Sequence, residues 1–364
     1  MARPIRVGIT HGDINGISYE VIIKALGDER IPELCTPVVF GSSKLVGYYR
    51  KALGLDDAFY NQIRNAPEAH DGQCNIVNIT DGEFKVEMGV ATEESGRAAL
   101  MALDAACEAL RNHEIDVLVT APINKSAMQM AGFGFPGHTE YLQQQLGEGA
   151  QATMILFNEN MRVALVSIHT PIKDVPAAIT REAIVDKAKT LDATLRRDFA
   201  IERPRIAVLA LNPHAGDNGV LGSEENDIIR PAIDDCAADG ILAFGPYAAD
   251  GFFGSGVWKK YDGILAMYHD QGLAPFKALA ASEGVNYTAG LPFIRTSPDH
   301  GTGYDIAGKG VADPASMRQA IYSAIDIFRA RNIYDRASAN PLRKHYEARG
   351  ADKTVDLTKD EPTL

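Results

Sequence analysis

The sequence predicts an α/β protein, and two patterns along its 364 residues lead to this prediction. Short runs rich in β-branched residues alternate with longer stretches of helical periodicity, as they do in α/β folds. The predicted strands cover residues 5–9, 37–40, 115–120, 154–157, 163–168, 206–211 and 264–268. Because single cores tend to stop growing at about 250–300 residues, we expect the chain to divide into two domains.

The clearest predicted helix covers residues 92–112, where apolar side chains recur at spacings of three and four. Its apolar stripe is formed by Leu100, Leu103, Cys107 and Leu110. Similar patterns predict helices over residues 181–197 and 314–331. Helical sequence rich in acidic and basic residues follows the last of these, toward a polar tail ending at Leu364.

Charge and composition exclude several classes of protein. The 48 acidic residues outnumber the 36 basic residues, and a net charge of -12 is the wrong sign for binding a nucleic-acid backbone. No apolar run approaches the roughly 18 residues of a membrane helix, and no cleavage-like leader is visible. The four cysteines lie far apart without a CxxC spacing, which is typical of reduced thiols. We therefore expect a cytoplasmic protein with no nucleic-acid or membrane partner.

Three histidines each follow a predicted buried strand: His169, His214 and His269. Ligands of open α/β sheets bind at the carboxyl ends of strands, so these imidazoles are candidates to converge there. Three neutral imidazoles with an open position form a known kind of catalytic zinc site, and imidazole also suits other divalent ions. Each histidine taken alone is more typical of a helix cap or a core position, so the hypothesis of a metal site rests on the repeated placement.

Several residues are candidates to bind an anion. His138 and Thr139 open a predicted helix, where backbone N–H groups also favour anions, although Thr139 serves equally well as a plain N-cap. Lys277 and Arg295 are cations in apolar segments, where a phosphate or carboxylate substrate would compensate their charge. Asn286, between them, is a neutral donor and acceptor, and alone it is more typical of a turn.

Residues 297–310 form a glycine-rich loop that permits close approach to a ligand. Within it, His300 and Asp305 are candidates to stack on an adenosine and to bind its ribose, and Gly301 and Thr302 lie between them. The strand-to-helix turn at Gly12 and Asp13 has two glycines and either approaches a ligand or merely turns the chain. No GxGxxG follows a predicted strand, so a classical Rossmann site is not supported.

Together these motifs resemble the family of 4-hydroxythreonine-4-phosphate dehydrogenases of pyridoxal phosphate biosynthesis. The matching stretches run from residue 8 to about residue 320 and include Ala-Pro-Ile-Asn-Lys, Phe-Pro-Gly-His-Thr-Glu, Leu-Asn-Pro-His-Ala-Gly, Tyr-His-Asp-Gln-Gly-Leu and Gly-Leu-Pro-Phe-Ile-Arg-Thr-Ser. The loop Asp-His-Gly-Thr-Gly-Tyr-Asp-Ile-Ala-Gly-Lys-Gly also resembles the nucleotide loop of isocitrate and isopropylmalate dehydrogenases. The resemblance implies their fold, which has two α/β domains and a cleft between them.

The resemblance also implies an organisation and a site. A discontinuous nucleotide-side domain is expected over residues 1–130 and 305–364, and a metal, substrate and dimerisation domain over 131–304. One divalent ion (zinc, magnesium or cobalt) is expected on His169, His214 and His269. The protein is expected to be a homodimer with the active site at the interface and the third histidine supplied by the other chain. Substrate contacts fall on His138, Thr139, Lys277, Asn286 and Arg295, and contacts to NAD or NADP are expected at Gly12, Asp13, His300, Gly301, Thr302 and Asp305.

The activity implied is oxidation of the 3-hydroxyl of 4-phosphooxy-L-threonine to 2-amino-3-oxo-4-phosphooxybutanoate, which decarboxylates to 3-amino-2-oxopropyl phosphate. Lys277 is a candidate anion clamp or proton acceptor, and Asp250 and Asp270 are candidate carboxylates for proton handling. The nearest alternative is a paralogue acting on threonate or erythronate 4-phosphate, or a diol dehydrogenase of aromatic degradation. A phosphotransacetylase-like enzyme and a non-catalytic nucleotide-binding regulator are less compatible with the histidine set.

One stretch departs from the family. Near the N-terminus the family usually has Gly-Asp-Pro-Ala-Gly-Ile-Gly-Pro-Glu, whereas residues 12–20 of this chain lack both prolines. The shape of this turn and its contacts therefore do not follow from the resemblance.

Overall fold

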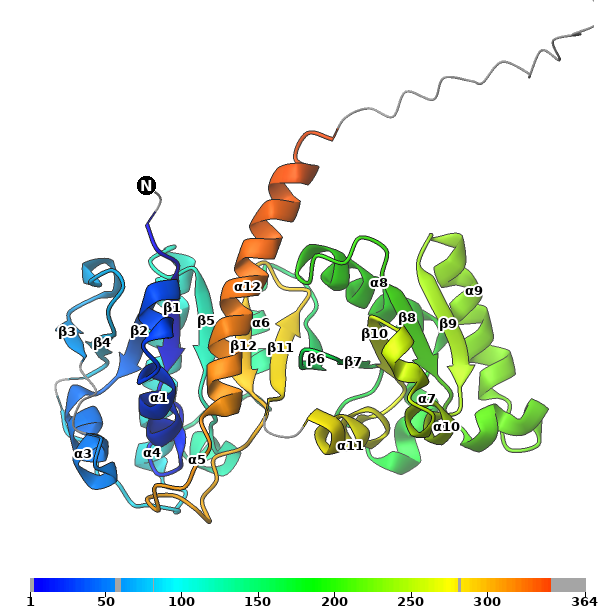
Figure 1. Ribbon diagram of the computed structural model, residues 1–364. Helices are drawn as coiled ribbons and strands as arrows, with labels where there is room; N and C mark the ends of the chain where they lie inside the picture. Colours follow the sequence, from blue (N-terminus) through cyan, green and yellow to red (C-terminus); the bar gives the residue numbers. More distant parts are fainter. Residues whose placement is uncertain (1–2, 56–59, 81, 281–282, 342–364) are drawn as a thin grey trace, which may run out of the picture.

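The computed structural model describes residues 3–55, 60–80, 82–280 and 283–341, which form an α/β structure around one long sheet (Figure 1). The predicted α/β class is thereby confirmed. The twelve strands in the described residues are β1 Arg6–Thr10, β2 Thr36–Gly41, β3 Asn61–Ile63, β4 Asn75–Asn78, β5 Val117–Thr120, β6 Thr153–Phe157, β7 Arg162–Leu165, β8 Arg205–Leu209, β9 Leu242–Tyr247, β10 Gly263–Ala266, β11 Val285–Ala289 and β12 Arg295–Pro298.

The sheet has the order β3-β4-β2-β1-β5-β12-β11-β6-β7-β10-β8-β9. The strands from β3 to β12 are parallel to one another, and so are the strands from β7 to β9. Between these sets, β11 runs antiparallel to both β12 and β6, and β6 runs antiparallel to β7. The late strands β11 and β12 therefore join the first half of the chain to the second at the middle of the sheet.

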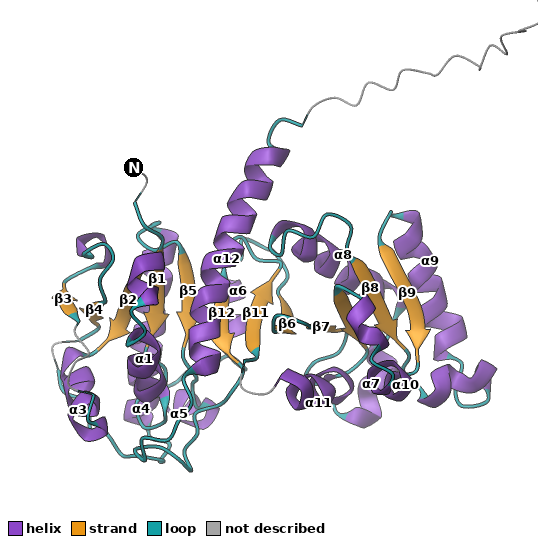
Figure 2. Ribbon diagram, viewed as in Figure 1, coloured by secondary structure: helices purple, strands orange, loops and turns teal. Residues whose placement is uncertain are grey.

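Helices cover both faces of the sheet (Figure 2). Their bounds are α1 Ser18–Leu26, α2 Arg30–Leu34, α3 Ser43–Leu53, α4 Glu93–Arg111, α5 Lys125–Met130, α6 His138–Leu146, α7 Val175–Ala178, α8 Arg181–Arg197, α9 Arg230–Ala238, α10 Ala249–Gly254, α11 His269–Ala280 and α12 Ala315–Ser338. The three predicted helices correspond to α4, α8 and α12, and α12 continues seven residues past the predicted end at residue 331.

Local chemistry explains where two of these helices start. Thr92 caps α4 by accepting from the Ser95 backbone N–H at 3.1 Å, and the Ser95 hydroxyl completes a capping box with the Thr92 backbone. Thr180 caps α8 in the same way, accepting from Ala183 N at 3.1 Å. These caps satisfy N–H groups that otherwise have no partner at a helix start.

All seven predicted strands are present, as β1, β2, β5, β6, β7, β8 and β10. The central strands β1 and β5 are almost wholly buried, as parallel strands covered on both faces must be. The strands absent from the prediction were the short β3 and β4, β9 at the far edge, and β11 and β12 in the middle. The last two carry buried polar residues in place of an apolar run, so hydrophobic patterning did not reveal them.

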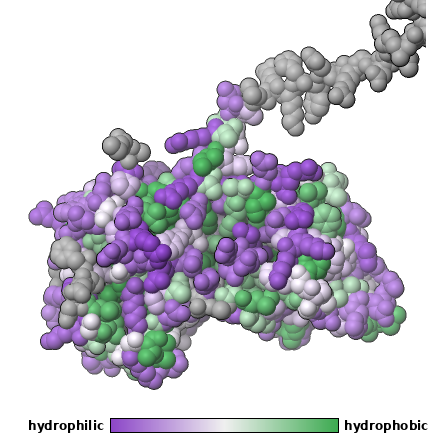
Figure 3. Space-filling view, viewed as in Figure 1, coloured by the Kyte–Doolittle hydropathy of each residue, from purple (hydrophilic) through white to green (hydrophobic). Residues whose placement is uncertain are grey.

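The surface and the thiols agree with the composition. No helix among the described residues is both long and apolar enough to cross a membrane. The face in Figure 3 mixes hydrophilic with hydrophobic residues. All four cysteines are free and buried. The division into residues 1–130 with 305–364, and 131–304, stays a prediction, and its part beyond residue 341 lies outside the described residues.

Candidate active site

A pocket of about 310 Å³ lies at the middle of the sheet, where the two halves of the chain meet. Its walls come from the end of β5, the start of α6, strands β6, β11 and β12, and helix α11, which packs on β6, β7 and β10 (Figure 1). The pocket brings together nine of the predicted site residues: His138, Thr139, His169, His269, Lys277, Asn286, Arg295, His300 and Gly301.

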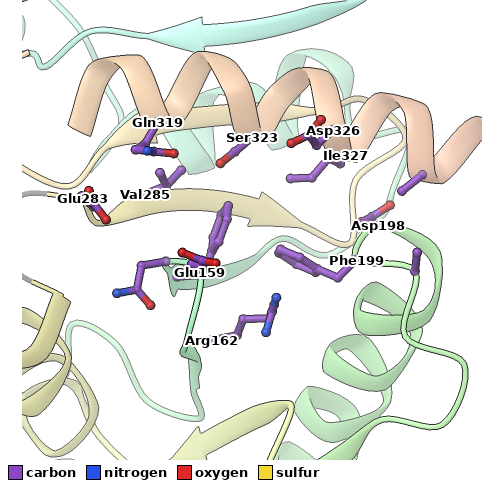
Figure 4. Close-up of a pocket in the computed structure, with 14 residues that line it drawn as sticks. Glu159, Arg162, Asp198, Phe199, Glu283, Val285, Gln319, Ser323, Asp326 and Ile327 are labelled. Carbon is purple, nitrogen blue, oxygen red and sulfur yellow. The ribbon is translucent and has the colours of Figure 1, made fainter. Parts of the chain in front are cut away.

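A larger cavity of about 480 Å³ lies elsewhere, between α12, the end of α8 and the β6–β7 hairpin (Figure 4). Arg162 extends toward Phe199 in it, with the guanidinium carbon 4.8 Å from the ring centroid. None of the predicted site residues lines this cavity. The smaller pocket is therefore the candidate active site, because nine of the predicted site residues line it and none lines the larger cavity.

Arg295 is the central cation of the pocket and is only 3% exposed. Its guanidinium donates to the Thr120 hydroxyl at 2.6 and 2.9 Å and to the Thr288 hydroxyl at 3.1 Å. Among the described residues no carboxylate forms an ion pair with it, although Glu140 lies near enough to exert some attraction. Burial consequently lowers the pKa of Arg295 to about 10. This group lacks a strong counter-charge, which an anionic substrate would supply.

His138 lies at the start of α6 and takes no proton at neutral pH. Its pKa is held well below the ordinary value of 6.5 by burial and by the charge of Arg295. A neutral imidazole can both donate and accept hydrogen bonds, unlike the positive charges nearby. Gly137 occupies the N-cap position and Thr139 lies inside the first turn. The alternative in which Thr139 caps the helix is therefore wrong.

Lys277, near the end of α11, and Asn286 of β11 also line the pocket, and Asn286 lies on the same sheet face as Arg295. The Lys277 ammonium donates to the Asp299 carbonyl oxygen at 3.4 Å and lies 3.9 Å from its carboxylate. Asn286 is part of a strand, so its reading as a turn residue is wrong. Its Oδ1 and the Nε2 of His300 are buried without a hydrogen-bond partner among the described residues. Buried polar atoms without partners are rare, and a bound ligand would satisfy them.

His169 and His269 face the pocket with ring centroids 6.4 Å apart. Burial is the main cause that lowers the pKa of His169, which leaves this ring neutral, as a metal ligand must be. The Nδ1 of His269 lies 2.7 Å from Asp270 Oδ1, an arrangement in which a carboxylate orients a histidine and leaves Nε2 free. The pair therefore fits two of the ligands of a divalent ion.

His214 lies in the loop after β8 and does not line the pocket. Across the described part of the chain no three histidine, cysteine, aspartate or glutamate side chains are gathered as metal ligands. Residues 214–218 all have positive φ angles, between 43° and 77°, and so form a left-handed turn. Such backbone costs roughly 1–2 kcal/mol for each residue other than glycine, so the surrounding contacts must hold it.

The remaining predicted residues lie away from these pocket walls. Asp250 is exposed in the first turn of α10, and Asp270 contacts only its neighbour His269 among the predicted set. Asp305 is exposed on the glycine-rich loop. Neither carboxylate proposed for proton handling lines the pocket.

Gly12 and Asp13 are buried, and hydrogen bonds at Asp13 and Ile17 fasten the N-terminal turn to the glycine-rich loop. Asp13 accepts from the Tyr304 hydroxyl at 2.6 Å, and the Thr302 carbonyl accepts from Ile17 N at 2.9 Å. Gly12 has a φ of +65°, and a Cβ there would lie 2.4 Å from a carbonyl oxygen. Direct contact of these residues with a nucleotide stays a prediction.

Residues 12–20, which depart from the family pattern, are held in place by hydrogen bonds of two of their own side chains. The Asn15 amide donates to Val90 O at 2.8 Å and to the Thr92 hydroxyl at 3.1 Å. The Tyr19 hydroxyl accepts from Ser42 N at 2.9 Å and lies 2.7 Å from His11 Nδ1. Buried hydrogen bonds thus hold the conformation of this turn, which contains no proline.

Sequence reasoning missed three charged residues of the pocket: Lys125, Glu140 and Asp299. Lys125 begins α5 just after β5, in the Ala-Pro-Ile-Asn-Lys stretch, and Glu140 belongs to Gly-His-Thr-Glu. The sequence could have indicated Lys125 and Glu140 in the same way as the histidines, because each lies near a strand end or at a helix start.

Comparison with known proteins identifies relatives along nearly the whole chain. The family model described as pyridoxal phosphate biosynthetic protein PdxA matches residues 33–324. A 4-hydroxythreonine-4-phosphate dehydrogenase of Bacteroides thetaiotaomicron is 55% identical over 98% of each chain. Another of that name from Sulfurihydrogenibium is 40% identical over 90% of this chain and 99% of its own. The crystal structure of the Klebsiella pneumoniae 4-hydroxythreonine-4-phosphate dehydrogenase, 34% identical, superposes with a TM-score of 0.77 over 90% of this chain and 99% of that chain.

Proposed function

Because this chain belongs to the family of the pyridoxal phosphate biosynthetic protein PdxA, we propose that its central pocket binds 4-phosphooxy-L-threonine and oxidises the 3-hydroxyl. The family makes the chain an oxidoreductase, a 4-hydroxythreonine-4-phosphate dehydrogenase. The observation that carries the proposed site is the buried Arg295 guanidinium, whose hydrogen-bond partners among the described residues are threonine hydroxyls and which shares its pocket with the imidazoles of His169 and His269.

The chain's own residues divide the work of binding and orienting. Arg295 and Lys277 hold the anionic ends of the substrate, because charge-assisted hydrogen bonds to phosphate and carboxylate are the strongest available here. Fixing both ends places the hydroxyl in one geometry for hydride transfer. Thr139 and the neutral His138 add hydrogen bonds beside Arg295 without adding charge.

Asn286 is suited to recognise the substrate amino group. Its buried Oδ1 has no partner among the described residues, and an ammonium group would supply the missing donor. A threonate or erythronate phosphate carries a hydroxyl at that position, which can also donate but carries no charge. Asn286 therefore favours the amino acid without excluding the sugar acids.

We assign His169 and His269 as ligands of a divalent ion (zinc, magnesium or cobalt), with His214 completing the set. When bound, the ion supplies Lewis-acid polarisation of the substrate hydroxyl, and NAD or NADP supplies the hydride acceptor. Asp270 keeps the His269 ring oriented through its 2.7 Å contact. Lys277 lies on the same pocket wall and is the candidate to receive the hydroxyl proton.

The protein is proposed to act as a cytoplasmic homodimer whose interface completes the active site. His214 does not line the pocket of its own chain, so completion of the metal site from a second chain is consistent with the single-chain geometry. Gly12, Asp13, His300, Gly301, Thr302 and Asp305 are proposed for the nucleotide side of the site.

Steady-state assays test this proposal directly. Purified protein, treated with chelator and then supplied with zinc, magnesium or cobalt, is assayed with 4-phosphooxy-L-threonine, threonate 4-phosphate and erythronate 4-phosphate, each with NAD and with NADP. We expect metal-dependent turnover of the amino acid. Turnover of a sugar acid phosphate alone would refute the substrate, and full turnover after metal removal would refute the metal.

A matched pair of variants tests the ligand assignment. His214→Ala should abolish turnover while the circular dichroism spectrum and thermal unfolding midpoint stay as in the wild type. His113→Ala changes a histidine in the turn after α4, outside the pocket, and should leave turnover unchanged. Equal activity of both variants would remove His214 from the mechanism.

A further inference from the structure

We propose that Glu225 is a positioning residue that fixes the loop presenting His214. Glu225 follows that loop, at the start of a single π-helical turn over Glu225–Ile229, a form often found at functional sites. Its side chain is 1% exposed, and among the described residues it takes part in no ion pair. A buried carboxylate without a cation must be held by hydrogen-bond donors.

Those donors come from the strand end that leads into the loop. Glu225 Oε1 accepts from the backbone N–H of Leu211 at 2.9 Å and of Asn212 at 2.7 Å. Its Oε2 accepts from the Asn212 side-chain amide at 3.1 Å. Hydrogen bonds to a charged acceptor are roughly twice as strong as neutral ones, so this carboxylate fixes the backbone two residues before His214.

The carboxylate also lies directly against the left-handed turn. A Cβ added to Gly216 would lie 2.5 Å from Glu225 Oε2, so the turn closes onto the carboxylate with no room to spare. The Glu225 carboxylate, which fixes the strand end, therefore also lies against the strained residues 214–218. Among the described residues, no group other than the Glu225 carboxylate accepts the backbone N–H groups of Leu211 and Asn212.

A second contact ties this loop to the other two histidine loops. The Gln271 amide donates to Ala210 O at 2.6 Å, and its carbonyl accepts from Met267 N at 2.8 Å. Met267 O in turn accepts from Ser167 N at 3.0 Å. Hydrogen bonds thus link the strand ends before His169, His214 and His269, and a shift at Asn212 moves His214 relative to the rest of its own chain, which would displace this histidine from the site that it completes in the second chain.

This inference rests on the proposed function, because it concerns the position of a proposed metal ligand. The test uses the full-length, chelator-treated protein with Co²⁺ as the probe and two readouts. One is the Kd for Co²⁺ by calorimetric titration, and the other is amide hydrogen exchange over residues 211–220 of the metal-free protein.

Glu225→Gln is the informative variant. In either orientation the new amide turns an NH₂ group toward a donor, so one contact with Asn212 or with the two backbone N–H groups is lost. We expect a 10- to 100-fold weaker Kd for Co²⁺, as found for residues that orient metal ligands, and faster exchange at Leu211 and Asn212. Saturating Co²⁺ should restore kcat, which a general loss of folding would not allow.

Glu224→Gln is the matched control. Glu224 is adjacent, carries the same charge and also accepts from the Asn212 side-chain amide, at 2.7 Å, but it accepts no backbone N–H of the loop. We expect wild-type Co²⁺ affinity and wild-type exchange at Leu211.

The outcomes separate the two proposals. If the wild type binds no Co²⁺, the proposed metal site fails and the role of Glu225 falls with it. If the wild type binds Co²⁺ and Glu225→Gln binds it equally well, the metal site stands and the positioning role is overturned. Equal weakening by the Glu224 and Glu225 variants would also overturn it, because charge and not the backbone contact would then be the cause.

Discussion

Two buried arginines of this chain differ in their counter-charges, and we predict unequal losses of stability when each is replaced by methionine. Arg331 is 7% exposed and forms an ion pair with Asp198 at 2.8 Å, while it also donates to the Tyr287 hydroxyl at 2.8 Å. Arg295 is 3% exposed, and in the part of the chain that the structure describes its partners are the hydroxyls of two threonines. Methionine preserves much of the volume in both places and removes the charge.

The magnitudes follow from these contacts. Burial lowers the pKa of Arg295 from 12.5 to about 10, and at roughly 1.4 kcal/mol per pKa unit this is a penalty of about 3 kcal/mol on the charged form. Three lost hydrogen bonds to hydroxyls, at about 1 kcal/mol each, offset the relief of that penalty. Arg295→Met should therefore change the free energy of unfolding by less than about 1 kcal/mol. Arg331→Met leaves the Asp198 carboxylate buried and unpaired, which costs about 3–5 kcal/mol.

Urea denaturation at equal protein concentrations measures both changes, with the fluorescence of the one tryptophan, Trp258, as the signal. The same Arg295→Met protein should lose about 2 kcal/mol or more of transition-state binding in kcat/KM, because the substrate anion loses its buried partner. If Arg295→Met destabilises the protein as strongly as Arg331→Met, Arg295 has a counter-charge of its own and the reasoning about the substrate clamp fails.

Three further predictions concern the N-terminal turn. Burial lowers the pKa of His11 to about 4, so between pH 6.5 and 4 only the unfolded chain binds this proton, and the free energy of unfolding should fall by up to about 3 kcal/mol as pH drops through that window; a His11→Gln protein with the same pH dependence would contradict this. Tyr304→Phe removes the donor to buried Asp13 and should cost about 1–3 kcal/mol in urea denaturation, together with a higher KM for NAD in steady-state titrations; unchanged values of both would separate this loop from the nucleotide. Gly12→Ala should lower the thermal unfolding midpoint more than Gly54→Ala, because both have a φ near +65° but only Gly12 meets a carbonyl oxygen within 2.4 Å; equal midpoints would show that φ alone matters.

The sequence by itself determined the fold class, the seven apolar strands and the starts of the long helices. These features depend on local patterns, namely the alternation of buried runs and the capping residues Thr92 and Thr180. It also identified nine residues that share the central pocket, because side chains at strand ends and helix starts of an α/β sheet converge.

Only the tertiary structure decided what the polar residues of the middle strands do. Asn286 and Arg295 lie on β11 and β12, which apolar patterning could not reveal because these strands carry buried polar residues; Arg295, for example, donates to Thr120, which is distant in sequence. The left-handed turn at His214 and the support of Glu225 beneath it likewise depend on contacts between separate segments. Local sequence encodes periodicity and caps, whereas the pairing of buried charges and strained turns is fixed when distant segments pack together.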